Sequence, residues 1–203
     1  MKLTKLMKCL SLYLLLFLFT LQTPSRADDI SEFEIEGISI GDSALDFFTE
    51  RQIKDNSFDY YNDKLFTPVQ TQHLPFFNTY DGLDFDFKTN DKDYIIHALY
   101  GRINYQENIK DCYKKMDEIV LEMSDTFKNI AQKGKKDIER DPRYTGDPTG
   151  KTIVTRLSFW FDNDDRASIS CYDYSEEHGG LDNLTVGVQT KEQNNFLLEK
   201  AYK

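Results

Sequence analysis

Residues 108–127, NIKDCYKKMDEIVLEMSDTF, contain the clearest periodic pattern in the sequence. Lysines and glutamates occupy one side of a helical projection, and apolar side chains recur at steps of three and four residues on the other. The apolar positions are Ile109, Cys112, Tyr113, Met116, Ile119, Val120, Met123 and Phe127. This spacing predicts a helix from Ile109 to Phe127, capped by Asn108, whose apolar face covers another layer of the fold.

Segments on both sides of this helix alternate apolar and polar residues with a period of two, as strands with one wet face do. The predicted strands are 83–88, 94–105, 153–161, 167–171 and 184–188. The links between most of them are short, which favours antiparallel pairing. We therefore expect an α+β fold with a single antiparallel sheet of about five strands and the long helix packed on one face.

Short helices are expected at both ends of this domain. Asp42 is placed to cap a helix through Phe48, Thr49 and Gln52 form a capping-box pattern, and Thr190 precedes a final helix with Gln193 three residues on. Between these elements, residues 56–80 are predicted to be an aromatic loop packed on the core. Residues 133–151 are polar and interrupted by glycine and proline, and are predicted to be an exposed loop.

The N-terminus has the pattern of a secretory signal peptide. Lys2, Lys5 and Lys8 precede an apolar run of about 13 residues, and small side chains at Ser25 and Ala27 suit a signal-peptidase site. A membrane anchor is a weaker alternative, because a spanning helix needs about 20 apolar residues. We predict cleavage after Ala27, a single domain over residues 28–203 with no membrane span, and a periplasmic or extracellular location.

Charge and cysteine content change when this segment is removed. The chain of 203 residues has 25 basic and 35 acidic residues. Removing the signal peptide, which contains four basic residues, leaves 21 basic and 35 acidic residues and a formal net charge of −14. Such acidity argues against nucleic acid as a partner. Two cysteines remain, Cys112 and Cys171, and an exported protein favours a disulfide between them over two free thiols. A disulfide that closes a loop of about 60 residues stabilises the folded state by about 4 kcal/mol in the chain-entropy model.

One motif suggests catalysis. Gly41, Asp42 and Ser43 resemble the first block of the GDSL esterases, a resemblance that implies Ser43 as nucleophile and His178 as base. Ser175 stands where that family has an aspartate three residues before the histidine, and the chain does not alternate strands and helices as that fold does. Asp42 and Ser43 opening a helix is the simpler interpretation. We expect no catalytic, metal-binding or cofactor-binding residues.

Two other features bear on partners. Residues 128–156 contain eight basic and four acidic residues, so this segment could dock an acidic partner, although an ordinary solvated loop is favoured. Aromatic residues in polar surroundings could line a pocket or an interface, although packing at the edge of the core is favoured. These aromatic residues are Tyr60, Tyr61, Phe76, Phe77 and Tyr80.

Both ends of the mature chain carry a resemblance. Residues 34–48, EIEGISIGDSALDFF, and residues 195–202, NFLLEKAY, resemble an uncharacterised family of small exported proteins of marine alphaproteobacteria. The resemblance implies an exported bacterial protein and brings no site residues with it. We expect a non-catalytic binding or structural protein of the periplasm or envelope, with an envelope protein as the candidate partner. The alternatives are the small esterase and an assembly factor for an outer-membrane complex.

Overall fold

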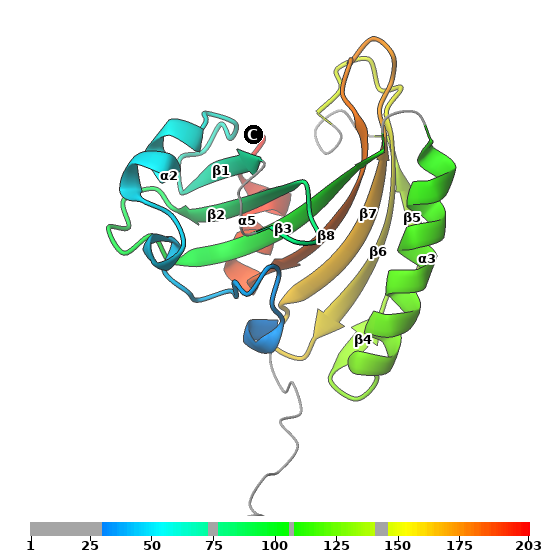
Figure 1. Ribbon diagram of the computed structural model, residues 1–203, viewed down its shortest axis with the longest axis horizontal. Coiled ribbons are helices and arrows are strands. Elements are labelled where there is room, and N and C mark those ends of the chain that lie inside the picture. Colours follow the sequence, from blue (N-terminus) through cyan, green and yellow to red (C-terminus); the bar gives the residue numbers. More distant parts are fainter. Residues whose placement is uncertain (1–29, 73–76, 106–107, 141–145) are drawn as a thin grey trace, which may run out of the picture.

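The computed structural model describes residues 30–203 except 73–76, 106–107 and 141–145. Eight strands of the described residues form one antiparallel sheet in the order β1-β2-β3-β8-β7-β6-β4, with β5 paired to the other half of β6 (Figure 1). The strands are β1 (Phe66–Gln72), β2 (Gly82–Lys88), β3 (Ile96–Tyr105), β4 (Ala131–Lys133), β5 (Asp137–Glu139), β6 (Ile153–Phe161), β7 (Arg166–Asp173) and β8 (Asp182–Gln189). The expectation of an α+β fold with one antiparallel sheet is confirmed.

The long helix α3 (Ile109–Thr126) lies where its apolar face predicts (Figure 1). It crosses β7, β8 and β3, and its buried residues include Cys112, Met116 and Met123. The predicted disulfide between Cys112 and Cys171 of β7 is present, with an S–S distance of 2.01 Å. The helix and the centre of the sheet are therefore covalently joined.

The same face of the sheet carries the main core. Alternate strand residues such as Phe85, Leu99 and Ile169 are buried there under α3 and under the N-terminal segment, residues 30–48. That segment contains the short 3-10 helices η1 (Ile30–Glu32) and η2 (Ala44–Asp46). It continues into α2 (Glu50–Asn56), whose capping box between Thr49 and Gln52 is formed as predicted.

Several local expectations are wrong. The sheet has eight strands instead of about five, because part of the predicted loop 56–80 forms β1 and parts of residues 131–139 form β4 and β5. Pro68 interrupts the strand pattern of β1, so the sequence did not predict this strand. Proline is tolerated there because β1 is an edge strand. The strands β4 and β5 have only three residues each, which is too few to show an alternation of apolar and polar residues in the sequence.

Two predicted caps also differ. Ser43, not Asp42, is the N-cap of the short η2 helix, while the Asp42 carboxylate accepts from the backbone N–H of Ser39. Asn108 occupies the N-cap position of α3, but its side chain makes no cap hydrogen bond and donates to Asp111 instead.

The other face of the sheet is polar and is partly covered by α5 (Lys191–Glu199), seen behind the sheet in Figure 1. Tyr61, Phe66, Phe196 and Ala201 form a small second apolar cluster that holds this helix and the segment Phe58–Tyr61 to the sheet. Thr190 caps α5 as predicted by accepting from the N–H of Gln193. The space between this cover and the sheet is where the polar side chains converge.

Among the described residues, no helix is both long and apolar enough to cross a membrane. The predicted signal peptide, residues 1–27, and its cleavage site after Ala27 lie outside the described residues, so they stay predictions.

Candidate ligand-binding pocket

Strand register arranges the polar face as rows of side chains that run across the sheet. Neighbouring strands pair so that every second residue points to this face. Three rows are Asp86–Ala98–Gln189–Arg166, Asp84–Tyr100–Gly187–Ser168 and Gly82–Arg102–Thr185–Ser170–Arg156. Gly187, Ser168, Ser170 and Thr185 are small and central, whereas the long charged side chains stand nearer the ends of the rows. The centre of the face is therefore hollow.

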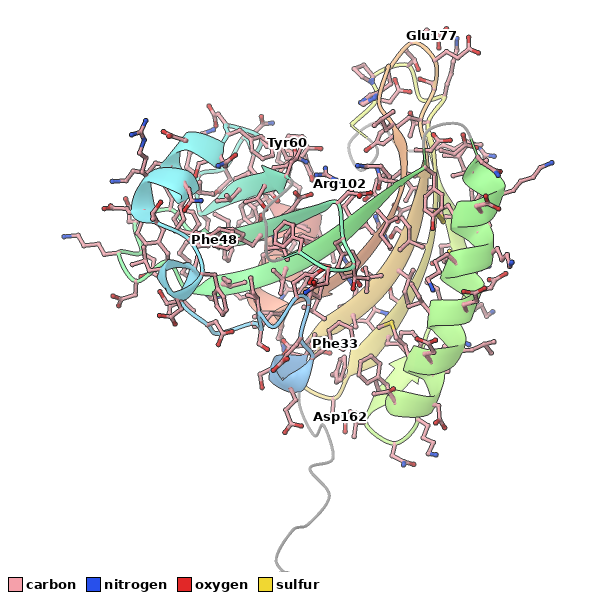
Figure 2. The ribbon with its side chains drawn as sticks, in the orientation of Figure 1. Phe33, Phe48, Tyr60, Arg102, Asp162 and Glu177 are labelled. Carbon is pink, nitrogen blue, oxygen red and sulfur yellow. A yellow bond between two sulfur atoms is a disulfide. The ribbon has the colours of Figure 1, made fainter. Side chains whose placement is uncertain are left out.

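The hollow is closed into a pocket of about 390 Å³. Its floor is β2, β3 and β6–β8, and its walls come from α5, from the segment Phe58–Tyr61 and from the C-terminal Tyr202. Tyr60 belongs to one wall and Arg102 to the floor; both are labelled in Figure 2. The volume is within the range of small-molecule sites.

Tyrosines give the pocket most of its aromatic surface. Tyr60, Tyr61 and Tyr202 contact one another edge to face at ring-centroid separations of 5.4 to 5.9 Å. Tyr172 and Tyr174, which also line the pocket, stack at 5.7 Å. Burial raises the pKa of Tyr60, and that of Tyr174 and Tyr202 more strongly, so these hydroxyls stay protonated at neutral pH.

Two of the three pocket arginines pair with carboxylates. Arg156 Nη1 donates to Glu139 Oε1 and Oε2 at 3.1 and 3.0 Å, and its Nε donates to Ser170 Oγ at 3.0 Å. Arg102 Nη1 lies 3.7 Å from Asp84 Oδ2, beyond hydrogen-bond distance. This pair is therefore looser than the first.

The third arginine is connected to a buried carboxylate by two glutamines. Arg166 Nε donates to Gln189 Oε1 at 2.8 Å, and Gln189 Nε2 donates to Gln193 Oε1 of α5 at 3.1 Å. Gln193 Nε2 then donates to Asp86 Oδ2, which also accepts from the Tyr61 hydroxyl at 2.8 Å. The chain of amides thus fixes both α5 and Tyr61 to the sheet.

Asp86 is the most buried carboxyl of this network, with 3% of its surface exposed. Burial raises the pKa of Asp86 to about 6, against the opposing effect of the hydrogen bonds from Tyr61 and Gln193, and the charge of Asp84 adds to the rise. Burial likewise raises the pKa of Asp84 to about 6, although 28% of its side chain is exposed. Both carboxyls therefore change protonation close to neutral pH.

Three residues that line the pocket each have a buried polar side-chain atom with no hydrogen-bond partner among the described residues. These atoms are Asp84 Oδ1, Arg102 Nε and Asn194 Oδ1. An unsatisfied buried group costs about 1–3 kcal/mol, and most native buried polar groups are paired. Donor and acceptor atoms left over on one cavity are the pattern expected of a site that hydrogen-bonds a ligand.

The described aromatic residues that were predicted to line a pocket or interface lie on different faces of the sheet. Tyr60 and Tyr61 line the pocket, as the binding hypothesis requires. Phe77 and Tyr80 instead pack against the main core on the other face, where the Tyr80 ring covers Gly101. Phe76 falls in residues 73–76, outside the described part of the chain.

Ser43 and His178 are not brought together. The Ser43 hydroxyl donates to the carbonyl of Asp93 at 2.5 Å, and Ser43 bridges to Ile95 just before β3. The His178 ring stacks on Tyr174 at 4.5 Å in the β7–β8 connection, next to the other end of β3. The length of β3 separates them by roughly 30 Å, so the esterase alternative has no geometric support.

The basic segment 128–156 is partly neutralised within the protein. Lys136 pairs with Asp117 at 2.8 Å, Arg156 pairs with Glu139, and Lys151 pairs with Glu177. Glu177 is labelled near the tip of the β7–β8 hairpin in Figure 2. In the ranges the structure describes, no group of three or more metal-ligating side chains could hold a metal ion. The polar face of the sheet is therefore the strongest candidate site.

The sequence contained a signal for this site. Strand positions on a solvated face usually carry mixed exposed side chains, whereas here the large side chains of Tyr100 and Arg102 fall in the interior of β3, and Arg166 is the first residue of β7. Comparison with family models, curated proteins and solved structures finds no match. The resemblance to exported proteins of alphaproteobacteria therefore stays a prediction, and the function has to be argued from the pocket itself.

Proposed function

We propose that this protein is an exported, non-catalytic binding protein that holds a small polar ligand between the sheet and α5. The observation that carries the proposal is the pocket of about 390 Å³, whose lining residues Asp84, Arg102 and Asn194 each have a buried polar atom without a partner among the described residues. A ligand with hydroxyl, amide or acid groups suits a pocket lined by such polar side chains, and the tyrosine rings supply apolar contact area.

Binding fits these residues better than catalysis does. Tyr100 is one hydroxyl of the pocket floor, and burial together with the charge of Asp86 raises its pKa well above 10. At neutral pH it is a hydrogen-bond donor and acceptor, not a nucleophile or base. Two other hydroxyls of the floor, those of Ser168 and Ser170, lie on β7. Ser158 and Gly187 pair with Ser168, and Arg156 and Thr185 pair with Ser170, so neither serine has a histidine or carboxylate across from it in the register.

Export is part of the proposal. The disulfide between Cys112 and Cys171 is consistent with an oxidising compartment, and the signal-peptide pattern at residues 1–27 points the same way. A binding protein in the periplasm or outside the cell would meet its ligand there.

Ligand retention tests the proposal. Oxidised protein, residues 28–203, is incubated with a small-molecule extract of the producing cells, desalted, denatured and analysed by mass spectrometry. We expect one or a few compounds to be enriched. Ser168→Trp, which fills the pocket centre, should lose them, whereas Leu121→Trp should keep them, because Leu121 is 71% exposed on α3.

Circular dichroism and thermal unfolding confirm that each variant is folded. Enrichment by the wild type that Ser168→Trp retains would place the ligand elsewhere and overturn the proposal. The absence of any retained compound would overturn it as well.

A further inference from the structure

Arg166 differs from the other two pocket arginines in its surroundings. Arg156 and Arg102 each face a carboxylate, at 3.0 and 3.7 Å. Arg166, among the described residues, has no carboxylate within ion-pair distance and donates only to the amide oxygen of Gln189, from both Nε and Nη2. A guanidinium has five N–H donors, so most of this group's donor capacity is unused.

The positive charge of Arg166 is only weakly compensated. Its Cζ lies 5.6 Å from the centre of the Trp160 ring, a cation–π distance that contributes modestly. Burial and the positive charge of Arg156 lower the pKa of Arg166 to about 10, so it stays protonated at neutral pH in an environment that disfavours its charge. A bound anion would relieve that cost.

Neutral donors stand beside this guanidinium. Ser168 follows Arg166 on the same face of β7, and Tyr100 lies two strands away in the next row. Neither hydroxyl makes a side-chain hydrogen bond to another described residue. The three side chains line one pocket and together offer N–H and O–H groups to an incoming oxyanion.

We propose that the pocket's ligand carries a carboxylate that binds the Arg166 guanidinium, with Ser168 and Tyr100 as further hydrogen-bond donors. The inference rests on the proposed function and names the chemical class of its ligand. Guanidinium and carboxylate match in planar, bidentate geometry.

Charge favours a monoanion over a phosphate dianion. The pocket lining includes three arginines, Arg102, Arg156 and Arg166, and three carboxyls, those of Asp84, Asp86 and Glu139. When all six groups are ionised, their charges sum to zero. Among the three arginines, only Arg166 has no carboxylate of the described residues adjacent to it. A second negative charge on the ligand would therefore meet no free cation among the described lining residues, whereas one carboxylate completes the pairing.

Acetate and acetamide form a matched pair of probes, because they have nearly the same shape and differ in charge. Each is titrated into ¹⁵N-labelled protein, residues 28–203, at constant ionic strength set with sodium chloride. We expect acetate, up to ~100 mM, to cause saturable shifts of the Arg166 side-chain Nε–H signal and of the Gly187 and Ser168 amides. Acetamide should leave the Arg166 signal in place.

Two variants locate the anion. Arg166→Gln should weaken the acetate response of the Gly187 and Ser168 amides by roughly tenfold or more. Arg51→Gln makes the same chemical change at an arginine whose side chain is 89% exposed on α2, and it should bind acetate as the wild type does. Arg166→Lys keeps the positive charge but lacks the planar, bidentate guanidinium, so it should weaken acetate binding less than Arg166→Gln does. It replaces the glutamine variant if that variant does not fold.

The results separate the two proposals. Equal shifts with acetate and acetamide, no saturable shift at Arg166, or an acetate response that survives Arg166→Gln overturn the carboxylate inference. If the retention experiment still yields an uncharged compound held in the pocket, the proposed binding function stands although the carboxylate inference fails. If wild-type protein retains no compound, the proposed function itself fails, whatever acetate does.

Discussion

The ring of Tyr100 lies flat across the backbone of Gly187 on the neighbouring strand. A Cβ atom at Gly187 would come within 2.2 Å of Tyr100 Cδ1 and 2.8 Å of Cε1, so only glycine fits beneath the ring. Tyr100 is paired directly opposite Gly187 in the register of β3 and β8. By lying on the sheet instead of standing up from it, the tyrosine leaves the pocket open above the row.

Gly187→Ala should therefore close part of the pocket. The added methyl group pushes the Tyr100 ring off the sheet and into the space above it, and strained repacking of this kind costs about 1–3 kcal/mol. Chemical denaturation should show that loss in the free energy of unfolding, and the retention experiment should show weaker ligand binding.

A double-mutant cycle checks the cause. In a Tyr100→Ala background the methyl group meets no ring, so Gly187→Ala should cost little or even stabilise the protein by restricting the unfolded chain. Equal costs of Gly187→Ala in both backgrounds would mean that contact with Tyr100 is not the reason.

The disulfide gives a second prediction. Cys112 and Cys171 are 59 residues apart, and cross-linking a loop of that length restricts the unfolded chain by about 4 kcal/mol in the chain-entropy model. The double substitution Cys112→Ala with Cys171→Ala should lower the free energy of unfolding by roughly that amount. Wild-type protein treated with reductant is the matched comparison; an unchanged denaturation midpoint in both samples would refute the expectation.

The elements that were predicted correctly share one physical property. Helix α3 and the strands around Phe85, Leu157 and Val186 each bury one face, so the apolar period appears directly in the sequence. The disulfide followed because a cysteine on the buried helix stripe and another on a buried strand face lie in the same interface.

The pocket was not predicted, because large polar side chains on one strand face do not by themselves indicate a cavity. Asp86 and Arg166 are 80 positions apart and are connected only through the register of four strands and the amides of Gln189 and Gln193. Alternation predicted a polar face, but whether water, a helix or a ligand covers that face depends on where α5 packs. The sequence pattern of α5 reveals its cap, not its position.

Asp86 gives a prediction about pH. Its pKa is about 6 in the folded protein and about 4 in an unfolded chain, so the folded state binds the proton more tightly. The stability that protonation contributes is present below pH 4 and is lost as the pH rises through 6, up to about 3 kcal/mol. Asp86→Asn, which stays neutral, should be more stable than wild type at pH 7, with a smaller advantage at pH 4.

Urea denaturation at pH 4, 5, 6 and 7 measures this difference. Asp55→Asn is the control, because that side chain is 65% exposed on α2 and lies outside the pocket. Some pH dependence should remain in Asp86→Asn, since burial also raises the pKa of Asp84. If Asp86→Asn destabilises the protein equally at every pH, hydrogen bonding at Asp86 outweighs its ionisation and the prediction is wrong.

Glu139 gives the last prediction, which concerns the charge of the pocket. Its carboxylate neutralises Arg156, whose positive charge in turn reaches Arg166 and helps to lower the pKa of that guanidinium. Glu139→Gln removes one negative charge and keeps a side chain of the same shape. The field at Arg166 becomes more positive, and a unit charge ~10 Å away in a medium of dielectric ~40 is worth about 0.8 kcal/mol, or about fourfold in affinity.

Acetate should therefore bind Glu139→Gln about fourfold more tightly than wild type in the NMR titration, with the same Arg166 signal moving. Glu118→Gln, an equal change of charge on the exposed side of α3, should leave the affinity unchanged. The gain should shrink as ionic strength rises, because salt screens charges that are not in contact. Combining Glu139→Gln with Arg166→Gln separates a general electrostatic effect from a new site: acetate binding that persists in this double variant would place the anion on Arg156, and its loss would keep it on Arg166.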